Sequence, residues 1–174
     1  LDQRAAPLLQ ALLPKALSAA IDWPTLQPAP EHLIDDHQQD RHTDRLFSVS
    51  LFGRPAFLYL TLEHKSRPDR WTALQVLTYV VGILRELRRR HPRARRLPPV
   101  IPVVVSLGRR QWRATTGLAD LLDLDHLSAE ARQFVLAGSP QFRIHPHDFA
   151  GRTPAEVRSM GLSLLGLCTA AATR

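Results

Sequence analysis

The stretch LYLTLEHKSRPD, residues 58–69, decides the fold expected for this chain. Leucines occupy alternate positions, which is the period-two pattern of a β-strand with one face in a core: Leu58, Tyr59, Leu60, Thr61, Leu62 and Glu63. The pattern then ends in Glu63-His64-Lys65, so a carboxylate and an ammonium leave the strand on the same face. This ending indicates either a surface ion pair or a chemical site.

A second strand-like run, DRLFSVSLF at 44–52, precedes PAFLYLTLEHK at 55–65. Gly53 and Arg54 separate the two runs, which is typical of a β-hairpin that turns at these residues. Asp44 opens the first strand and Glu63 closes the second, at equal distances from that turn. We therefore expect the two carboxylates to face each other across the ladder, where like charges repel and a divalent cation would offset the repulsion.

Two carboxylates at one sheet edge suit Mg²⁺, with Mn²⁺ as an alternative, because Mg²⁺ is commonly held by one or two carboxylates plus water and phosphate. Lys65 would orient or help deprotonate a metal-bound water that attacks a phosphodiester. The simpler alternative is that Asp44 caps the strand entry, while Glu63 and Lys65 form a surface ion pair of little energetic value. The spacing alone leaves both interpretations open.

The rest of the chain predicts a one-domain α/β protein, in which helices flank a mixed sheet. The longest helical pattern covers 70–91, with Asp69 as a plausible N-cap and an expected apolar face of Leu74, Leu77, Val81, Leu84 and Leu87. The other expected elements are a helix over 5–20 divided at Pro14, an extended connector over 22–33, a buried strand over 98–108, short helices over 118–127 and 128–138, a short strand over 141–146 and a closing helix over 153–172. The expected core spans about 5–108, and a mostly helical part spans 109–174.

The charge of the chain favours a polyanionic partner, with nucleic acid first. The 174 residues carry a formal net charge of +7, and the 23 basic residues comprise 21 Arg and only two Lys, of which Lys65 is one. The segment 85–96, RELRRRHPRARR, contains seven Arg and is interpreted either as a phosphate-binding patch or as a helix C-terminus whose cations suit the helix dipole. The sequence contains neither a run long enough for a membrane helix nor a signal-peptide pattern, so we expect a soluble, cytoplasmic protein.

Gln75 and Tyr79, in LQVLTY, lie four residues apart and share one face of the expected long helix. The order of the candidate residues resembles the motif order of the PD-(D/E)XK nuclease superfamily: Asp44, then Glu63-x-Lys65, then Gln75-x-x-x-Tyr79. Longer strings resemble one group within it, the recombination-promoting nuclease family (Rpn, YhgA-like), earlier described as transposases. These strings include LLPKALSAAIDWPTLQPAPEHLIDD, TDRLFSVSL, AFLYLTLEHKSRPDRWTALQVLTYVV and HPRARRLPPVIPVVVSLG followed by Trp112, and the resemblance runs from about residue 8 to about residue 125.

The resemblance implies a restriction-endonuclease-like core and a metal-dependent DNA endonuclease linked to recombination or mobile elements. Asp44 and Glu63 match the metal-binding carboxylates, and Lys65 matches the motif lysine. Gln75 and Tyr79 match the helix motif that positions DNA, and Arg67 and Arg70 are the basic residues nearest to the motif. Thr43 stands where the superfamily motif has proline, and the family usually has a longer segment before the position of Leu1.

Several alternatives remain open from the sequence. Asp35 or Asp36 is a candidate additional metal ligand. The rival function is a catalytically inactive module of the same fold that binds DNA or a protein partner. The oligomeric state is also open, with a homodimer among the alternatives.

Overall fold

The computed structural model describes residues 5–30, 33, 44–63, 69–107, 110–153 and 156. Its helices and strands follow one another in this order: α1 (Ala5–Leu12), α2 (Lys15–Ala20), β1 (Ile21–Pro28), β2 (Arg45–Leu51), β3 (Arg54–Glu63), α3 (Thr72–Arg90), β4 (Val100–Ser106), the 3₁₀ helix η4 (Ala119–Leu121), α4 (Ala129–Gly138) and β5 (Pro146–Asp148). Within these described ranges, none of the helices has the length and apolar character needed to cross a membrane.

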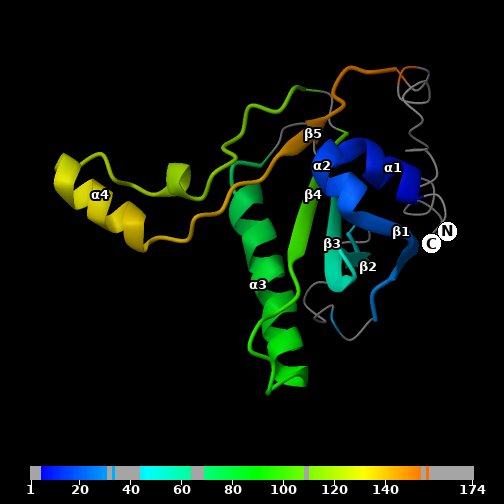
Figure 1. The fold of residues 1–174 in the computed structure, drawn as a ribbon. Coiled ribbons are helices and arrows are strands. Elements are labelled where there is room, and N and C mark those ends of the chain that lie inside the picture. The colour runs from blue at the N-terminus through cyan, green and yellow to red at the C-terminus, as the bar shows by residue number, and fades with distance from the viewer. Residues whose placement is uncertain are drawn as a thin grey trace.

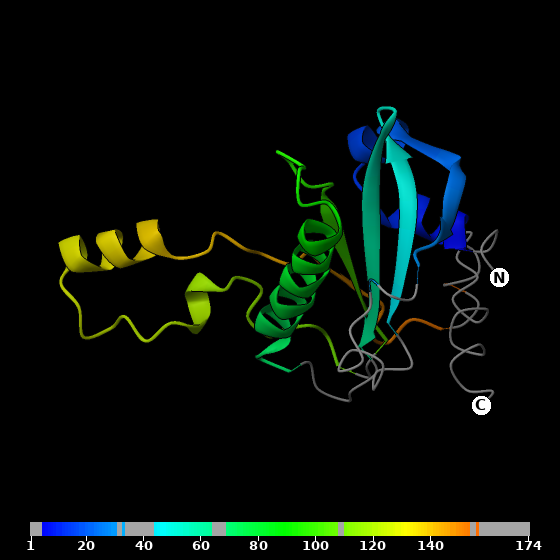
Figure 2. The same ribbon diagram turned by 90° about the horizontal axis from the view of Figure 1, so that it is seen from below.

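The five strands form one mixed sheet in the order β1-β2-β3-β4-β5. β2 is antiparallel to both β1 and β3, whereas β4 is parallel to both β3 and β5. Helices α1 and α2 lie on one face of the sheet and α3 lies on the other (Figures 1 and 2). This is the expected α/β architecture, a mixed sheet flanked by helices, consistent with a restriction-endonuclease-like core.

The hairpin of β2 and β3 turns at Phe52 and Gly53, one residue earlier than expected. Leu51 pairs with Arg54, and the central residues have φ values of 49° and 73°. Positive φ at both central positions is the mark of a type I′ turn, whose twist matches that of the flanking strands. Because the register follows from the turn, the strand partner of every residue in β2 shifts by two positions from the expected one.

β3 is buried on both faces rather than on one. Its even-numbered leucines pack toward α1, together with Val103 and Val105 of β4. Tyr59, from the opposite face, packs with Val76 and Val80 of α3. The polar residues that alternate with the leucines therefore lie beneath a helix, because β3 occupies the centre of the sheet.

The buried face of α3 differs from the expected one. The residues that face the sheet follow steps of three and four along a different stripe: Ala73, Val76, Val80, Ile83 and Leu87. Leu74 and Val81, expected in the core, are 40% and 43% exposed. The helix carries apolar residues on two stripes of equal spacing, and only the packing against the sheet decides which one is buried.

Three other elements depart from the sequence expectations. The connector expected over 22–33 contains edge strand β1, where prolines are tolerated because one side of the strand makes no ladder bonds. The helix expected over 118–127 is reduced to η4, and the late strand lies at Pro146–Asp148. This strand, β5, carries the sheet beyond residue 108, where the core was expected to end. The division of the first helical segment at Pro14 and the helix at 129–138 are confirmed. The closing helix over 153–172 lies almost wholly outside the described residues.

Candidate active site at the carboxyl ends of β3 and β4

Asp44 directly precedes β2, and its carboxylate is held by two hydroxyl groups. The phenol of Tyr59 donates to Asp44 Oδ2 at 2.7 Å, and Thr61 Oγ1 donates to Oδ1 at 2.6 Å. Tyr59 and Thr61 are two residues apart on β3 and therefore share the strand face that looks toward α3. Each carboxylate oxygen has a second lone pair, so the two bonds orient the group while leaving it able to bind a cation.

The register places Asp44 opposite Thr61 and not opposite Glu63. Arg45 pairs with Leu60, so the next pair outward is Asp44 with Thr61. The expectation that the two carboxylates oppose each other directly was wrong, because the turn lies at Phe52-Gly53. Glu63 is the diagonal neighbour of Asp44, at a typical spacing of about 7–8 Å, which long side chains can bridge.

Glu63 is the last residue of β3 and is 8% exposed. It pairs with Ser106 of β4, and its carbonyl accepts a hydrogen bond from Leu107 N at 2.9 Å. Its side chain projects from the same strand face as those of Tyr59 and Thr61. Buried charges in proteins are paired or hydrogen-bonded, because burial of an unpaired charge is costly.

Helix α3 brings Gln75 and Tyr79 over this strand face. The Tyr79 ring lies 5.7 Å from the ring of Tyr59, measured between centroids, at an interplanar angle of 53°. Gln75 lies one helical turn before Tyr79, a distance of about 6 Å along α3. Thr61 lies about 6.6 Å beyond Tyr59 along β3. Since α3 runs antiparallel to β3 in the crossover to β4 (Figure 1), ideal helix and strand rises lead us to expect Gln75 near the level of Thr61. Two residues of the helix motif therefore lie on the carboxylate side of the sheet.

Two buried polar atoms of this region have no hydrogen-bond partner within the described part of the chain. They are Gln75 Oε1 and Ser106 Oγ. Ser106 is 1% exposed and lies beside Glu63 in the sheet. Because buried polar atoms are nearly always paired, these two are the groups expected to bind water or a ligand.

Asp148 ends β5 next to Ser106, but its carboxylate is already engaged in structure. It accepts hydrogen bonds from Trp112 N at 2.6 Å and from Ala150 N at 3.0 Å. These bonds tie the end of β5 to the segment that follows β4 and to the turn that leaves β5. Asp148 was not among the residues expected here, and its carboxylate binds two backbone amides on the strand next to Ser106.

The entry to α3 carries Arg70, which is exposed. Its guanidinium carbon lies 4.9 Å from the centroid of the Trp71 ring. Asp69 does not cap the helix, because α3 begins at Thr72 with Trp71 as N-cap. Asp69 Oδ1 instead accepts from Trp71 N at 3.0 Å. The remaining expected site residues, Lys65 and Arg67, and the alternative ligands Asp35 and Asp36, lie outside the described residues.

The donor set fits a hydrated Mg²⁺. No group of three or more His, Cys, Asp or Glu side chains that could enclose a metal occurs among the residues whose structure is described. The site offers Asp44, oriented by two hydroxyls, and buried Glu63, which are oxygen donors from neighbouring strands on the same face of the sheet. Mg²⁺ keeps several waters and takes one or two carboxylates, so two protein ligands are sufficient.

The two residues that hold Asp44, Tyr59 and Thr61, were not among the site residues expected from the sequence. Their signal was present in the alternation of LYLTLE, which places both on the face of Glu63. That face was taken to be the one outside the core. The signal for Ser106 was weaker, because a serine at the end of a valine-rich strand has no distinctive spacing.

Comparisons with known proteins find relatives of similar sequence. The chain is 30% identical to the recombination-promoting nuclease RpnC of Escherichia coli strain K12 over 107 residues, which are 61% of this chain and 35% of that protein. It is 28% identical to RpnD of Escherichia coli O157:H7 over 106 residues, or 61% of this chain and 40% of that protein. A third relative, the "Putative inactive recombination-promoting nuclease-like protein YjiP" of strain K12, is 26% identical over 80 residues, or 46% of this chain and 78% of that protein. No solved structure matches the chain.

The matched part is well under half the length of RpnC and RpnD. The profile of one protein family matches residues 2–139, and the family is described as "Putative transposase, YhgA-like". Since that match covers most of the 174 residues, the chain belongs to the YhgA-like family.

Proposed function

We propose that this chain carries the catalytic core of a metal-dependent DNA endonuclease that acts in recombination or on mobile elements. The observation that supports it best is the orientation of Asp44 by Tyr59 and Thr61 on the strand face that ends in buried Glu63. Two of the relatives are named recombination-promoting nucleases, which favours the same activity. The basic character of the chain suits a DNA substrate.

In this proposal Asp44 and Glu63 hold Mg²⁺ or Mn²⁺. When bound, the cation supplies Lewis-acid stabilisation of the scissile phosphate and an acidified water. Lys65 orients that water or helps to take its proton. Gln75 and Tyr79 hold the DNA strand from α3, while Arg67 and Arg70 neutralise phosphates next to the site.

A first experiment measures metal binding without requiring turnover. The melting temperature of the chain is followed against MgCl₂, beside Asp44→Asn, Glu63→Gln and the control Asp123→Asn, whose side chain is 91% exposed and lies outside the site. We expect Mg²⁺ to stabilise the wild type and the control, by about 1.4 kcal/mol at tenfold excess over the dissociation constant, and to leave the two site variants unchanged. Equal stabilisation of all four proteins would contradict a metal site at Asp44 and Glu63.

A second experiment measures nicking of supercoiled plasmid with Mg²⁺ or Mn²⁺. Asp44→Asn and Lys65→Ala should abolish nicking, and Asp123→Asn should not. Equal nicking by the wild type and both site variants would contradict the proposed nuclease activity.

The competing function is a module of this fold that binds DNA or a protein partner without cutting. It is favoured by the name of the third relative, which describes a nuclease-like protein as inactive. This alternative expects DNA binding that weakens with salt, with no metal requirement and no change in Asp44→Asn. The plasmid experiment and a binding titration of Asp44→Asn together separate the two functions.

A further inference from the structure

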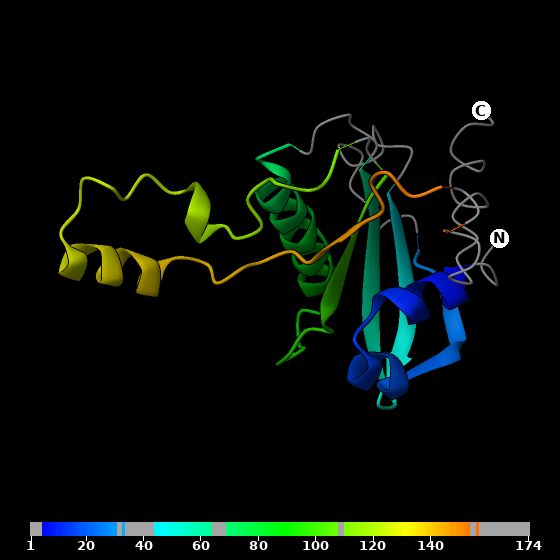
Figure 3. The ribbon, with the colours of Figure 1, turned by 90° about the horizontal axis from the view of Figure 1, so that it is seen from above.

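Residues 116–144 form an arm that projects from the body of the protein, and α4 lies at its far end (Figures 1 and 3). The base of the arm is a short antiparallel pair of chain segments. Leu118 N donates to Phe142 O at 3.0 Å, and Ile144 N donates to Thr116 O at 2.9 Å. Ile144 is 2% exposed in the core beneath α3, so this base anchors the arm to the body.

The helix at the end of the arm exposes an apolar stripe. The stripe consists of residues spaced three, one and three positions apart, a spacing that places them along one side of α4: Ala131, Phe134, Val135 and Gly138. The exposed fraction of Phe134 is 82%, and no residue of α4 is buried. Views from two sides show α4 well separated from α3 of the same chain (Figures 2 and 3). A helix with an exposed apolar stripe is typical of an interaction surface.

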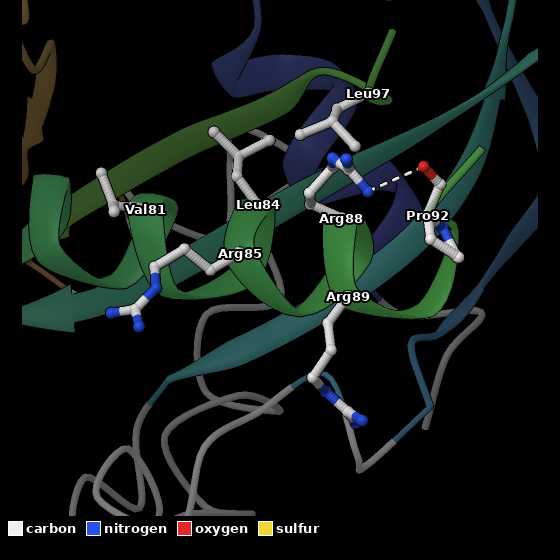
Figure 4. A pocket seen from close by; sticks show the side chains of 7 residues that line it. All are labelled: Val81, Leu84, Arg85, Arg88, Arg89, Pro92 and Leu97. Atoms are coloured by element: carbon white, nitrogen blue, oxygen red, sulfur yellow. Dashed lines mark hydrogen bonds between the residues drawn. The ribbon is translucent and has the colours of Figure 1, made fainter. Parts of the chain in front are cut away.

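A groove of about 560 Å³ lies along the outer side of α3 and has an apolar floor (Figure 4). The floor is formed by Val81, Leu84, Pro92 and Leu97, and the rim carries Arg85, Arg88 and Arg89. The helical part of the groove, from Val81 to Arg89, is about 12 Å long, and the ten residues of α4 span about 15 Å. An amphipathic helix of this size fits such a groove by laying its apolar stripe on the floor.

The charges of the two surfaces are complementary. The arm, residues 116–144, contains four acidic residues and two Arg, a formal charge of −2 in a chain whose net charge is +7. Its two Arg side chains bind Asp120 and Asp125, which leaves Asp123 and Glu130 as its unbalanced carboxylates. The segment 85–96 contains seven Arg and one Glu. That glutamate, Glu86, binds Arg89 and Arg90, and Arg88 Nη1 donates to the carbonyl of Pro92 at 2.9 Å. In Figure 4 the guanidinium of Arg85 points outward from the rim, where an acidic partner can reach it.

We propose that α4 of one copy binds in the α3 groove of a second copy, and that the exchange is reciprocal. The base of the arm directs α4 away from its own groove, which makes a second copy the fitting occupant. A two-fold dimer uses the arm-groove contact twice, and this doubling brings a small contact toward the roughly 1,200 Å² that a stable interface needs. The inference does not depend on the proposed nuclease activity, because it is tested by mass alone.

Two phenylalanines of equal exposure provide a matched test. Phe134 and Phe52 are each 82% exposed, but Phe52 lies in the β2–β3 turn, far from the arm. Sedimentation equilibrium of the whole chain should give a dimer for the wild type and for Phe52→Asp. Phe134→Asp should raise the dimer dissociation constant by more than about tenfold, because a carboxylate would enter an apolar groove. A monomeric wild type, or an equal effect of both substitutions, would overturn the proposal.

A charge exchange tests the partner surface independently. Arg85→Glu and Glu130→Arg should each weaken the dimer, and the double variant should regain part of the loss because the opposed charges are restored with reversed sign. A double variant weaker than either single variant would contradict the contact. If Arg85→Glu weakens binding of a DNA fragment and leaves the dimer mass unchanged, the groove is a DNA surface and the proposal fails.

Discussion

The hydroxyl of Tyr59 lies 2.7 Å from Asp44 Oδ2, and this bond joins a residue in the middle of the central strand to a carboxylate at the entrance of its neighbour. The same tyrosine ring packs against Tyr79 of α3. Tyr59 thus connects the candidate metal ligand with the helix that carries the candidate DNA-binding residues. The packing of α3 against Tyr59 therefore bears on the position of Asp44, which Thr61 also holds.

Tyr59→Phe should lower the nicking rate while preserving the fold. The substitution keeps the ring contact with Tyr79 and removes only the hydrogen bond to a charged acceptor, a bond worth about 1.5–3 kcal/mol. If that bond acts fully in the transition state, the rate falls about ten- to a hundredfold. Thr61→Val, which removes the second hydrogen bond, should act in the same direction. Single-turnover nicking rates measure both, and unchanged rates would show that the hydroxyls do not orient a working carboxylate.

Gln75→Leu should weaken DNA binding without lowering stability. Gln75 Oε1 is buried and has no partner within the described residues, so leucine removes an unsatisfied polar atom and breaks no protein hydrogen bond. We expect an unfolding free energy equal to or slightly above that of the wild type, together with a loss of about tenfold or more in DNA affinity. Urea titration and fluorescence anisotropy measure the two effects. A clear loss of stability would indicate a structural role for Gln75.

The sequence alone was sufficient to predict the α/β architecture and the order of the site motifs along the chain. The strand at 58–63 and the helix over 70–91 were predicted from the spacing of apolar residues along the chain. That spacing indicates the type of element whatever packs against it. Gln75 and Tyr79 were placed on one helix face for the same reason. These features need no knowledge of what lies opposite.

Two of the expectations that the structure contradicts depend on an alignment between elements. The turn lies at Phe52-Gly53, and a shift of one residue in the turn changed the expected partner of Asp44 from Glu63 to Thr61. Leu74 and Val81 have the spacing of a core stripe, yet the sheet takes the neighbouring stripe of α3. Register and helix rotation are set by tertiary packing, and periodicity alone does not encode them.

His147 should make the protein less stable in mild acid. Burial lowers the pKa of its imidazole, and the nearby charge of His145 lowers it further. Above the ordinary His pKa of about 6.5 the ring is neutral in both the folded and the unfolded chain. Below that pH the unfolded chain binds a proton that the folded protein does not, so stability falls until the pH reaches the lowered folded pKa. Urea unfolding between about pH 7.5 and 5 should show a smaller loss for His147→Gln, with exposed His91→Gln as control. If the unfolding free energy falls equally with pH in all three proteins, His147 is not the source of the loss.

Phe52→Asn should stabilise the hairpin that sets the register of Asp44. Phe52 has a φ of 49° and is 82% exposed, so its side chain gains little from burial while its backbone occupies the left-handed region. That conformation costs an ordinary L-residue about 1–2 kcal/mol, and asparagine followed by glycine is a preferred pair for a type I′ turn. We expect the unfolding free energy to rise by about 1 kcal/mol, with Gly53→Ala, at a φ of 73°, lowering it. Urea titration of the three proteins measures the order, and a less stable Phe52→Asn would mean that the aromatic ring contributes through contacts beyond the turn.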